Sequence, residues 1–305
     1  MSRRWLANGL LLVTAAVWGL AFVAQRAGME YVGPFTFNAV RFALGALALG
    51  AIVRIREKRL LHRALPRESV SRGIWLGVVL FIASSFQQVG IVYTTAGKAG
   101  FITGLYVVLV PLTGAVLLKE RHGVQVWVGA ALAAVGLYLL SVTGAWHMEK
   151  GDLLVLVSAL FWTVHVILVG RWTAEHDSLT LAALQFAAVA ALSAVVAAGW
   201  ETVTAAGLRG ALWAILYGGL ISVGVGYTLQ LVAQQYALPA HAAIILSLES
   251  AFAMLGGVAI LGEKVSARGL AGAILMLTAM VVSQIGAEGD AHLICETGAD
   301  VGREQ

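Results

Sequence analysis

Apolar stretches of about 20 residues follow one another along nearly the whole chain. A helix of about 20 apolar residues crosses the roughly 30 Å hydrocarbon core of a bilayer. The 305-residue chain is 60% hydrophobic and only 12% charged, whereas soluble domains carry about 25% charged residues. We therefore predict an all-α integral membrane protein.

The hydropathy pattern predicts ten transmembrane helices, most of them joined by short connections. Their expected ranges are 6–25, 36–54, 73–92, 98–118, 124–142, 152–171, 178–199, 211–236, 241–261 and 267–286. One connection, 54–72, is longer and strongly basic. The polar tail, 288–305, has no helical periodicity, and we expect it to be disordered.

Lysine and arginine are distributed unequally among the connections. They concentrate in the connections that would share a membrane face with the N-terminus, above all in 54–72, which holds Arg54, Arg56, Lys58, Arg59, Arg63, Arg67 and Arg72. Cytoplasmic connections of membrane proteins carry such an excess. We therefore predict that both termini are cytoplasmic. The net charge of +4 then reflects membrane orientation and not a nucleic-acid partner.

The two halves of the sequence are related by a nearly constant shift. A shift of 144 places FTFNAVRF, which begins at residue 35, on LTLAALQF, and it places Trp18 on Trp162. A shift of 143 places LKERHGVQVWVGA, which begins at residue 118, on LGEKVSARGLAGA. A shift that stays nearly constant over separate stretches indicates an internal repeat.

Each copy of the repeat, 1–145 and 146–287, holds five of the predicted spans. An odd number of spans turns the second copy over relative to the membrane, so the fold is expected to be two inverted five-helix repeats. Inverted repeats are typical of secondary transporters, whose substrate site lies near the bilayer midplane between the copies. A duplication in a lipid-modifying transferase or in a non-transporting membrane protein is the alternative.

Polar side chains at helical spacing mark the faces that avoid lipid. On this basis we predict one central cavity lined by Thr14, Trp18, Gln25, Gln87, Gln88, Thr103, Tyr106, Ser158, Trp162, His165, Tyr227, Gln230 and Gln234. Aromatic faces and amides suit a small zwitterionic or amphipathic solute. The alternative role for the same side chains is hydrogen bonding between helices.

Three ionisable residues within the predicted spans are candidates for function. Glu249 lies about eight residues into its span, roughly 12 Å deep at 1.5 Å per residue, where a protonatable group is a natural device for proton coupling. His165 can serve in the same way. Arg41, about five residues into its span, can bind a substrate carboxylate or reach the interface. The alternative for Glu249 is a structural partner for Arg41, Lys98 or His241.

The sequence carries no signature of metal, nucleotide or covalent chemistry. We therefore predict no cofactor and no enzymatic activity. The expected partners are a small-molecule substrate and membrane lipid, and homodimerisation is left open.

Four stretches carry a resemblance to a known family. They are AAVWGLAFVAQRAG from residue 15, FTFNAVRFALGALAL from 35, YTTAGKAGFITGLYVVLVPLTGAVLLKE from 93 and LSLESAFAMLGGVAILGEKVSARGLAGAILML from 246. In these, the chain resembles the drug/metabolite transporter superfamily, in its ten-span EamA-type branch. The resemblance implies a secondary carrier of the bacterial inner membrane, often an exporter of amino acids or other small metabolites. Many relatives have proline directly after the glutamate of the ninth span, where this chain has Ser250.

Overall fold

The computed structural model describes residues 3–59, 66–141, 149–261 and 266–285. The tail, 288–305, whose disorder was expected, lies outside these residues. The regular elements are the helices α1 (Arg3–Gly28), α2 (Pro34–Arg59), α3 (Arg67–Tyr93), α4 (Ala96–Gly104), α5 (Tyr106–Leu117), α6 (Val124–Ser141), α7 (Lys150–Trp172), α8 (Ser178–Trp200), α9 (Ala205–Gly210), α10 (Leu212–Leu216), η1 (Tyr217–Tyr227), α11 (Thr228–Gln234), α12 (Pro239–Leu246), α13 (Glu249–Leu261) and α14 (Ala267–Ile285).

Several of these elements, alone or in succession, are long and apolar enough to span a bilayer. Seven segments of the described chain meet that standard, namely Trp5–Gly28, Pro34–Arg56, Arg67–Tyr93, Lys98–Leu117, Lys150–Trp172, Ser178–Trp200 and Leu212–Gln234. Three shorter apolar helices correspond to the remaining expected spans, namely Val124–Leu140, Pro239–Leu255 and Ala267–Ser283. The prediction of an all-helical membrane protein is therefore confirmed.

Two of the expected spans are broken into half-helices. The fourth is interrupted at Leu105, between α4 and α5, and the ninth is interrupted at Ser247 and Leu248, between α12 and α13. At both breaks the backbone tightens into i→i+3 hydrogen bonds, from Leu105 N to Ile102 O and from Leu248 N to Ile245 O. Neither break contains a proline, because Pro111 lies inside α5, six residues after Leu105.

The eighth expected span contains an unusual stretch of backbone. Residues Tyr217–Tyr227 form the π-helix η1, which connects α10 to α11. The stretch is rich in glycine, and glycine removes the side chains that would otherwise keep neighbours away. A Cβ on Gly226 would lie 2.6 Å from Trp18 Nε1, and a Cβ on Gly219 would lie 2.9 Å from Arg41 O. Helices α1 and α2 therefore approach η1 closely.

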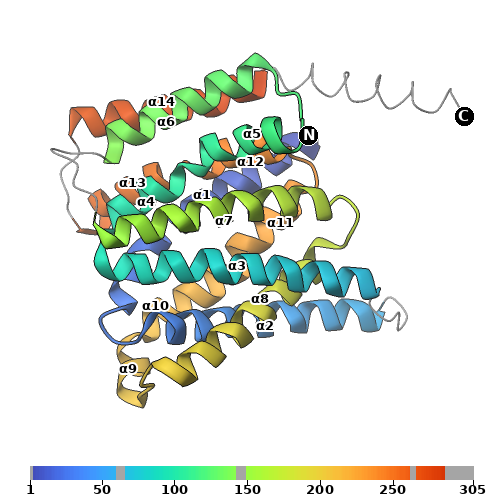
Figure 1. Ribbon diagram of the computed structural model, residues 1–305, viewed down its shortest axis with the longest axis vertical. Helices are drawn as coiled ribbons and strands as arrows, with labels where there is room; N and C mark the ends of the chain where they lie inside the picture. Colours follow the sequence, from blue (N-terminus) through green and yellow to red (C-terminus); the bar gives the residue numbers. More distant parts are fainter. Residues whose placement is uncertain (1–2, 60–65, 142–148, 262–265, 286–305) are drawn as a thin grey trace, which may run out of the picture.

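The helices pack as a layered bundle with two helix pairs at its edges (Figure 1). Helix α6 packs along α14 at one edge, and α2 packs along α8 at the other. Between them lie α1, α3 and α7 together with the broken helices. The α6–α14 contact brings backbones together, because a Cβ on Gly136 would lie 2.7 Å from Gly272 O.

Polar contacts join α2 and α8 at both ends of that pair. At one end, Glu201 accepts hydrogen bonds from the backbone N–H groups of Phe35 (2.9 Å) and Thr36 (2.7 Å), which open α2. At the other end, Arg56 of α2 forms a 2.6 Å ion pair with Asp177, the N-cap of α8. Contacts of this kind satisfy orphan N–H groups at helix N-termini.

The ion pair at the second end also perturbs Asp177. Partial burial alone would raise the pKa of this carboxyl group, but hydrogen bonds from Arg56 and Thr180 outweigh that effect. The pKa of Asp177 is therefore lowered from its ordinary value. The ionised form is the one that caps α8.

Candidate functional site

A small cavity of about 30 Å³ lies in the middle of the bundle. Both halves of the chain line it. The lining residues come from α1, α2, α3, α4, α5, α7, η1, α11, α12 and α13, and they are Trp18, Ala21, Phe22, Gln25, Arg41, Gln87, Thr103, Tyr106, Trp162, Val166, Ser222, Tyr227, Gln230, Leu246 and Glu249.

Three aromatic side chains form one wall of the cavity. The ring of Tyr227 lies 4.6 Å from that of Trp18 and stacks at 16° on that of Trp162, with centroids 6.0 Å apart. The two indoles, which the repeat relates, lie 6.4 Å from each other. Trp18 is fixed by a hydrogen bond from its Nε1 to the carbonyl of Ser222 in η1. The wall therefore joins the two halves of the chain.

Arg41 brings a buried cation to the cavity. Its side chain is only 2% exposed, and its guanidinium lies over the rings of Phe37 and Phe42, at 5.4 and 4.9 Å. The Nε atom donates a 3.0 Å hydrogen bond to Asn38 Oδ1. No carboxylate of the described residues forms an ion pair with Arg41. Arg41 therefore does not reach the interface but faces the cavity.

Glu249 brings a buried carboxyl group to the same cavity. It is 3% exposed, and its carboxylate accepts one hydrogen bond, 3.4 Å long, from the Tyr106 hydroxyl. No lysine or arginine of the described residues pairs with it, so the expected structural pairing with Arg41 or Lys98 is not formed. Tyr106 and Glu249 each begin the second half of a broken helix, and the 143-residue shift relates them.

Amide side chains complete the polar lining. Gln87 donates a 2.9 Å hydrogen bond to Thr103 Oγ1, which links α3 to α4. Gln25 Oε1, Gln230 Oε1 and Trp162 Nε1 are buried and have no hydrogen-bond partner among the described residues. Buried polar atoms without a partner cost free energy, so these three atoms are available to a polar group in the cavity.

Ten of the fifteen predicted site residues line this cavity, and His165 and Gln234 are among the five that do not. His165 lies behind the aromatic wall, edge-on to Trp162, with its Nε2 2.9 Å from Gln185 Oε1. Gln234 accepts a hydrogen bond from Gln230 and donates one to the carbonyl of Val166. Both therefore support the cavity wall from outside.

Of the other polar residues expected in the cavity, Thr103 lines it and Thr14, Gln88 and Ser158 do not. Thr14 instead hydrogen-bonds to the carbonyls of Leu10 and Gly226. Thr14 therefore illustrates the alternative role of polar groups between packed helices, whereas Gln88 and Ser158 are buried without a hydrogen-bond partner among the described residues.

The sequence analysis missed several cavity residues, most of them apolar. Ala21 and Phe22 follow Trp18 by three and four residues and so share its helix face. That spacing was a usable signal. Ser222 and Leu246 carried no such signal, because they belong to the π-helix and to a half-helix that ends at a break.

Comparison with known proteins bears on the whole chain. The model of the EamA-like transporter family matches residues 5–142 and, a second time, residues 149–284. A protein of Archaeoglobus fulgidus described as an uncharacterized transporter is 32% identical over 274 residues, which cover 90% of this chain and 84% of that protein. The uncharacterized transporter YoaV of Bacillus subtilis is 22% identical over 285 residues, which cover 88% of this chain and 92% of YoaV.

A solved crystal structure also resembles this one. It superimposes with a TM-score of 0.76 over 93% of this chain and 98% of the other, at 21% identity. At that identity the likeness concerns the fold alone.

Proposed function

Because this chain belongs to the EamA-like transporter family, we propose that it is a secondary carrier of small zwitterionic metabolites such as amino acids. The central cavity is its substrate site, and the carrier works by alternating access. Its place is the bacterial inner membrane, with both termini in the cytoplasm, and its direction is export. The proposal rests chiefly on one observation, the presence of Arg41 and Glu249 in one cavity without an ion pair.

The architecture of this carrier is ten spans in two inverted repeats. The packing supports it, because helices that the repeat relates lie against each other, α2 on α8 and α6 on α14. The two breaks fall in related spans, the fourth and the ninth. Discontinuous helices at corresponding positions of two repeats are a feature of transporter substrate sites.

Two buried charges of opposite sign define the solute chemistry. An unpaired charge is costly in a membrane interior, and a zwitterion offsets both costs at once. The guanidinium of Arg41 presents a donor fork that suits a carboxylate. The Glu249 carboxylate accepts from an ammonium group, and the Trp18 and Tyr227 rings add cation–π attraction.

Glu249 also provides the coupling step of the proposed cycle. A single carboxylate accepts either a proton or the substrate ammonium, so the two compete for one group. A proton entering from one side then releases the substrate toward that side. This competition converts a proton gradient into directed efflux, with no cofactor.

The test is counterflow in proteoliposomes that contain the purified protein. Vesicles are loaded with one unlabelled amino acid at a time and then presented with the same compound in labelled form. We expect accumulation for small zwitterions and little for the matching amines without a carboxylate or acids with a blocked amino group. Equal accumulation of amino acids, amines and blocked acids would contradict the proposal. The absence of accumulation for every amino acid tested would also contradict it.

A further inference from the structure

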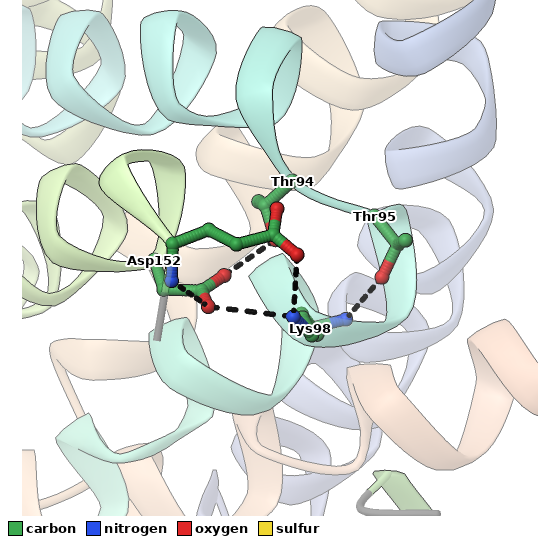
Figure 2. Close-up of polar contacts among 5 residues, drawn as sticks. Thr94, Thr95, Lys98 and Asp152 are labelled. Atoms are coloured by element: carbon green, nitrogen blue, oxygen red, sulfur yellow. Dashed lines mark hydrogen bonds and ion pairs between the residues drawn. The ribbon is translucent and has the colours of Figure 1, made fainter. Parts of the chain in front are cut away.

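One end of the bundle carries a polar cluster that joins three helices (Figure 2). Lys98, in the first turn of α4, extends its Nζ toward α7, where it lies 3.1 Å from Glu149 Oε1 and 3.5 Å from Asp152 Oδ2. Thr94, directly after α3, donates a hydrogen bond to Asp152 Oδ1. Thr95 caps α4 by accepting from the backbone N–H of Lys98.

Asp152 is the centre of this cluster. Its side chain is fully buried, and it also accepts a 2.9 Å hydrogen bond from the backbone N–H of Glu149. A buried carboxylate is stable only with such partners, and the loss of one partner is costly. The ammonium group of Lys98 supplies the positive charge that the carboxylate needs. The cluster therefore holds α4 and α7 together as long as the ion pair persists.

The backbones beneath the cluster are in direct contact. A Cβ on Gly151 would lie 2.6 Å from Gly90 O and 2.9 Å from Thr94 N, so only glycine allows α3 and α7 to meet here. Arg26 at the end of α1 adds a 3.1 Å hydrogen bond to the carbonyl of Ile91. This end of the bundle is therefore closed by both packing and charge.

The same helices connect the cluster to the cavity. Thr103 of α4 lines the cavity five residues after Lys98, about 7.5 Å along the helix. Trp162 of α7 lines it ten residues after Asp152, about 15 Å along. A movement that separates Lys98 from Asp152 therefore also separates two walls of the cavity.

The opposite end of the bundle lacks the charges of this cluster. The 144-residue shift places Asp152 on Asn8, and the 143-residue shift places Lys98 on His241. An amide thus replaces the carboxylate, and an imidazole replaces the ammonium group. At these repeat-related positions the two ends of a nearly symmetric molecule therefore differ in charge, although the opposite end has an ion pair of its own between Arg56 and Asp177.

We propose that the Lys98–Asp152 pair, with Thr94, is the latch of the gate between the cavity and the membrane face that carries Lys98. Closure of that face requires the pair, and opening breaks it. The latch also biases the resting carrier toward states that are closed on this face. This inference rests on alternating access as proposed above, but its test uses cavity accessibility and needs no substrate.

The test measures how fast a cavity cysteine reacts from each face. Cys295, the single cysteine of the chain, is replaced by serine, and Ala21 of the cavity lining is replaced by cysteine. A membrane-impermeant thiol reagent is applied to whole cells and, separately, to inverted vesicles. The labelling rate then reports the opening of each gate, whatever the substrate is.

We expect Asp152→Asn and Lys98→Met to raise the labelling rate about tenfold on one face only, as for a typical conformational coupling energy. The matched control is Asp177→Asn, which removes an ion pair at the other end of the bundle and should leave labelling on that face unchanged. Thr94→Val removes only a hydroxyl donor, keeps the charges and should give a smaller rise. Thr94→Val provides the test of the latch if Asp152→Asn and Lys98→Met do not fold. Unchanged labelling in the folded variants, or an equal rise with Asp177→Asn, would overturn the latch.

Discussion

The Arg41→Lys substitution tests the proposal that the guanidinium group of Arg41 binds the substrate carboxylate. Lysine keeps the positive charge but loses the planar fork of donors. In the structure, Nε of Arg41 is engaged with Asn38, and no described residue hydrogen-bonds to its two Nη atoms. Those two atoms are the ones that a substrate carboxylate would engage.

The expected magnitude follows from the bond that lysine cannot replace. A hydrogen bond to a charged group contributes about 1.5–3 kcal/mol, and each 1.4 kcal/mol is about a factor of ten in affinity. The half-saturating concentration of an amino acid should therefore rise by roughly 10- to 100-fold in Arg41→Lys. The maximal exchange rate should change much less, because the ground-state interaction is the one removed.

The assay is counterflow exchange, run with an amino acid and with its decarboxylated amine at high concentration. Only the amino acid should lose affinity in Arg41→Lys. Arg56→Lys is the matched control, since it makes the same change on the same helix, at an ion pair outside the cavity. An unchanged affinity for the amino acid, or an equal loss for the amine, would refute the role of Arg41.

Three further predictions concern other parts of the molecule. Glu249→Gln should abolish pH-driven flux and retain exchange at a raised half-saturating concentration, because the variant loses the charge that binds the substrate ammonium. pH-driven flux at the wild-type rate would exclude Glu249 as the coupling group. Gly226→Ala places a Cβ 2.6 Å from Trp18 Nε1, so overpacking should cost about 1–3 kcal/mol and lower the thermal unfolding midpoint. Gly224→Ala, which meets only one atom at 3.3 Å, is its control. The pKa of Asp177 is lower in the folded protein than its ordinary value near 3.8. Asp177 therefore stabilises the fold fully above pH 3.8, and this stabilisation is lost as the pH falls through the folded-state pKa. The difference in unfolding midpoint between wild type and Asp177→Asn should therefore disappear in acid, and a difference independent of pH would contradict it.

The spans and most of the inward faces could be predicted because both depend on the regular period of a helix. Trp18 and Gln25 are seven residues apart on α1, and both line the cavity, as their spacing predicted. The position of a residue on a helix face, however, predicts which way its side chain points and not whether that side chain reaches the cavity. His165 points inward like Trp162, yet it lies one layer behind the cavity wall.

The irregular segments could not be predicted in this way. Hydropathy treats 98–118 and 241–261 as uninterrupted spans, whereas the chain breaks at Leu105 and Ser247. The π-helix changes the number of residues per turn, so α-helical spacing along the eighth span missed Ser222. Gln234 lies in the regular helix α11, one turn after Gln230, and does not reach the cavity. Both kinds of irregularity depend on close contacts with other helices, which no local pattern encodes.

The inversion of the two repeats can be measured directly from the positions of two related connections. Glu30 lies between α1 and α2, and Glu175 lies between α7 and α8, at nearly the same place in the second copy. Both are exposed, so single cysteines at these sites can be labelled by an impermeant reagent in whole cells and in inverted vesicles. Two inverted repeats require the cysteine of Glu30→Cys to react only from outside and the cysteine of Glu175→Cys to react only from inside. Labelling of both from the same face would contradict the inverted architecture and, with it, the carrier built on that architecture.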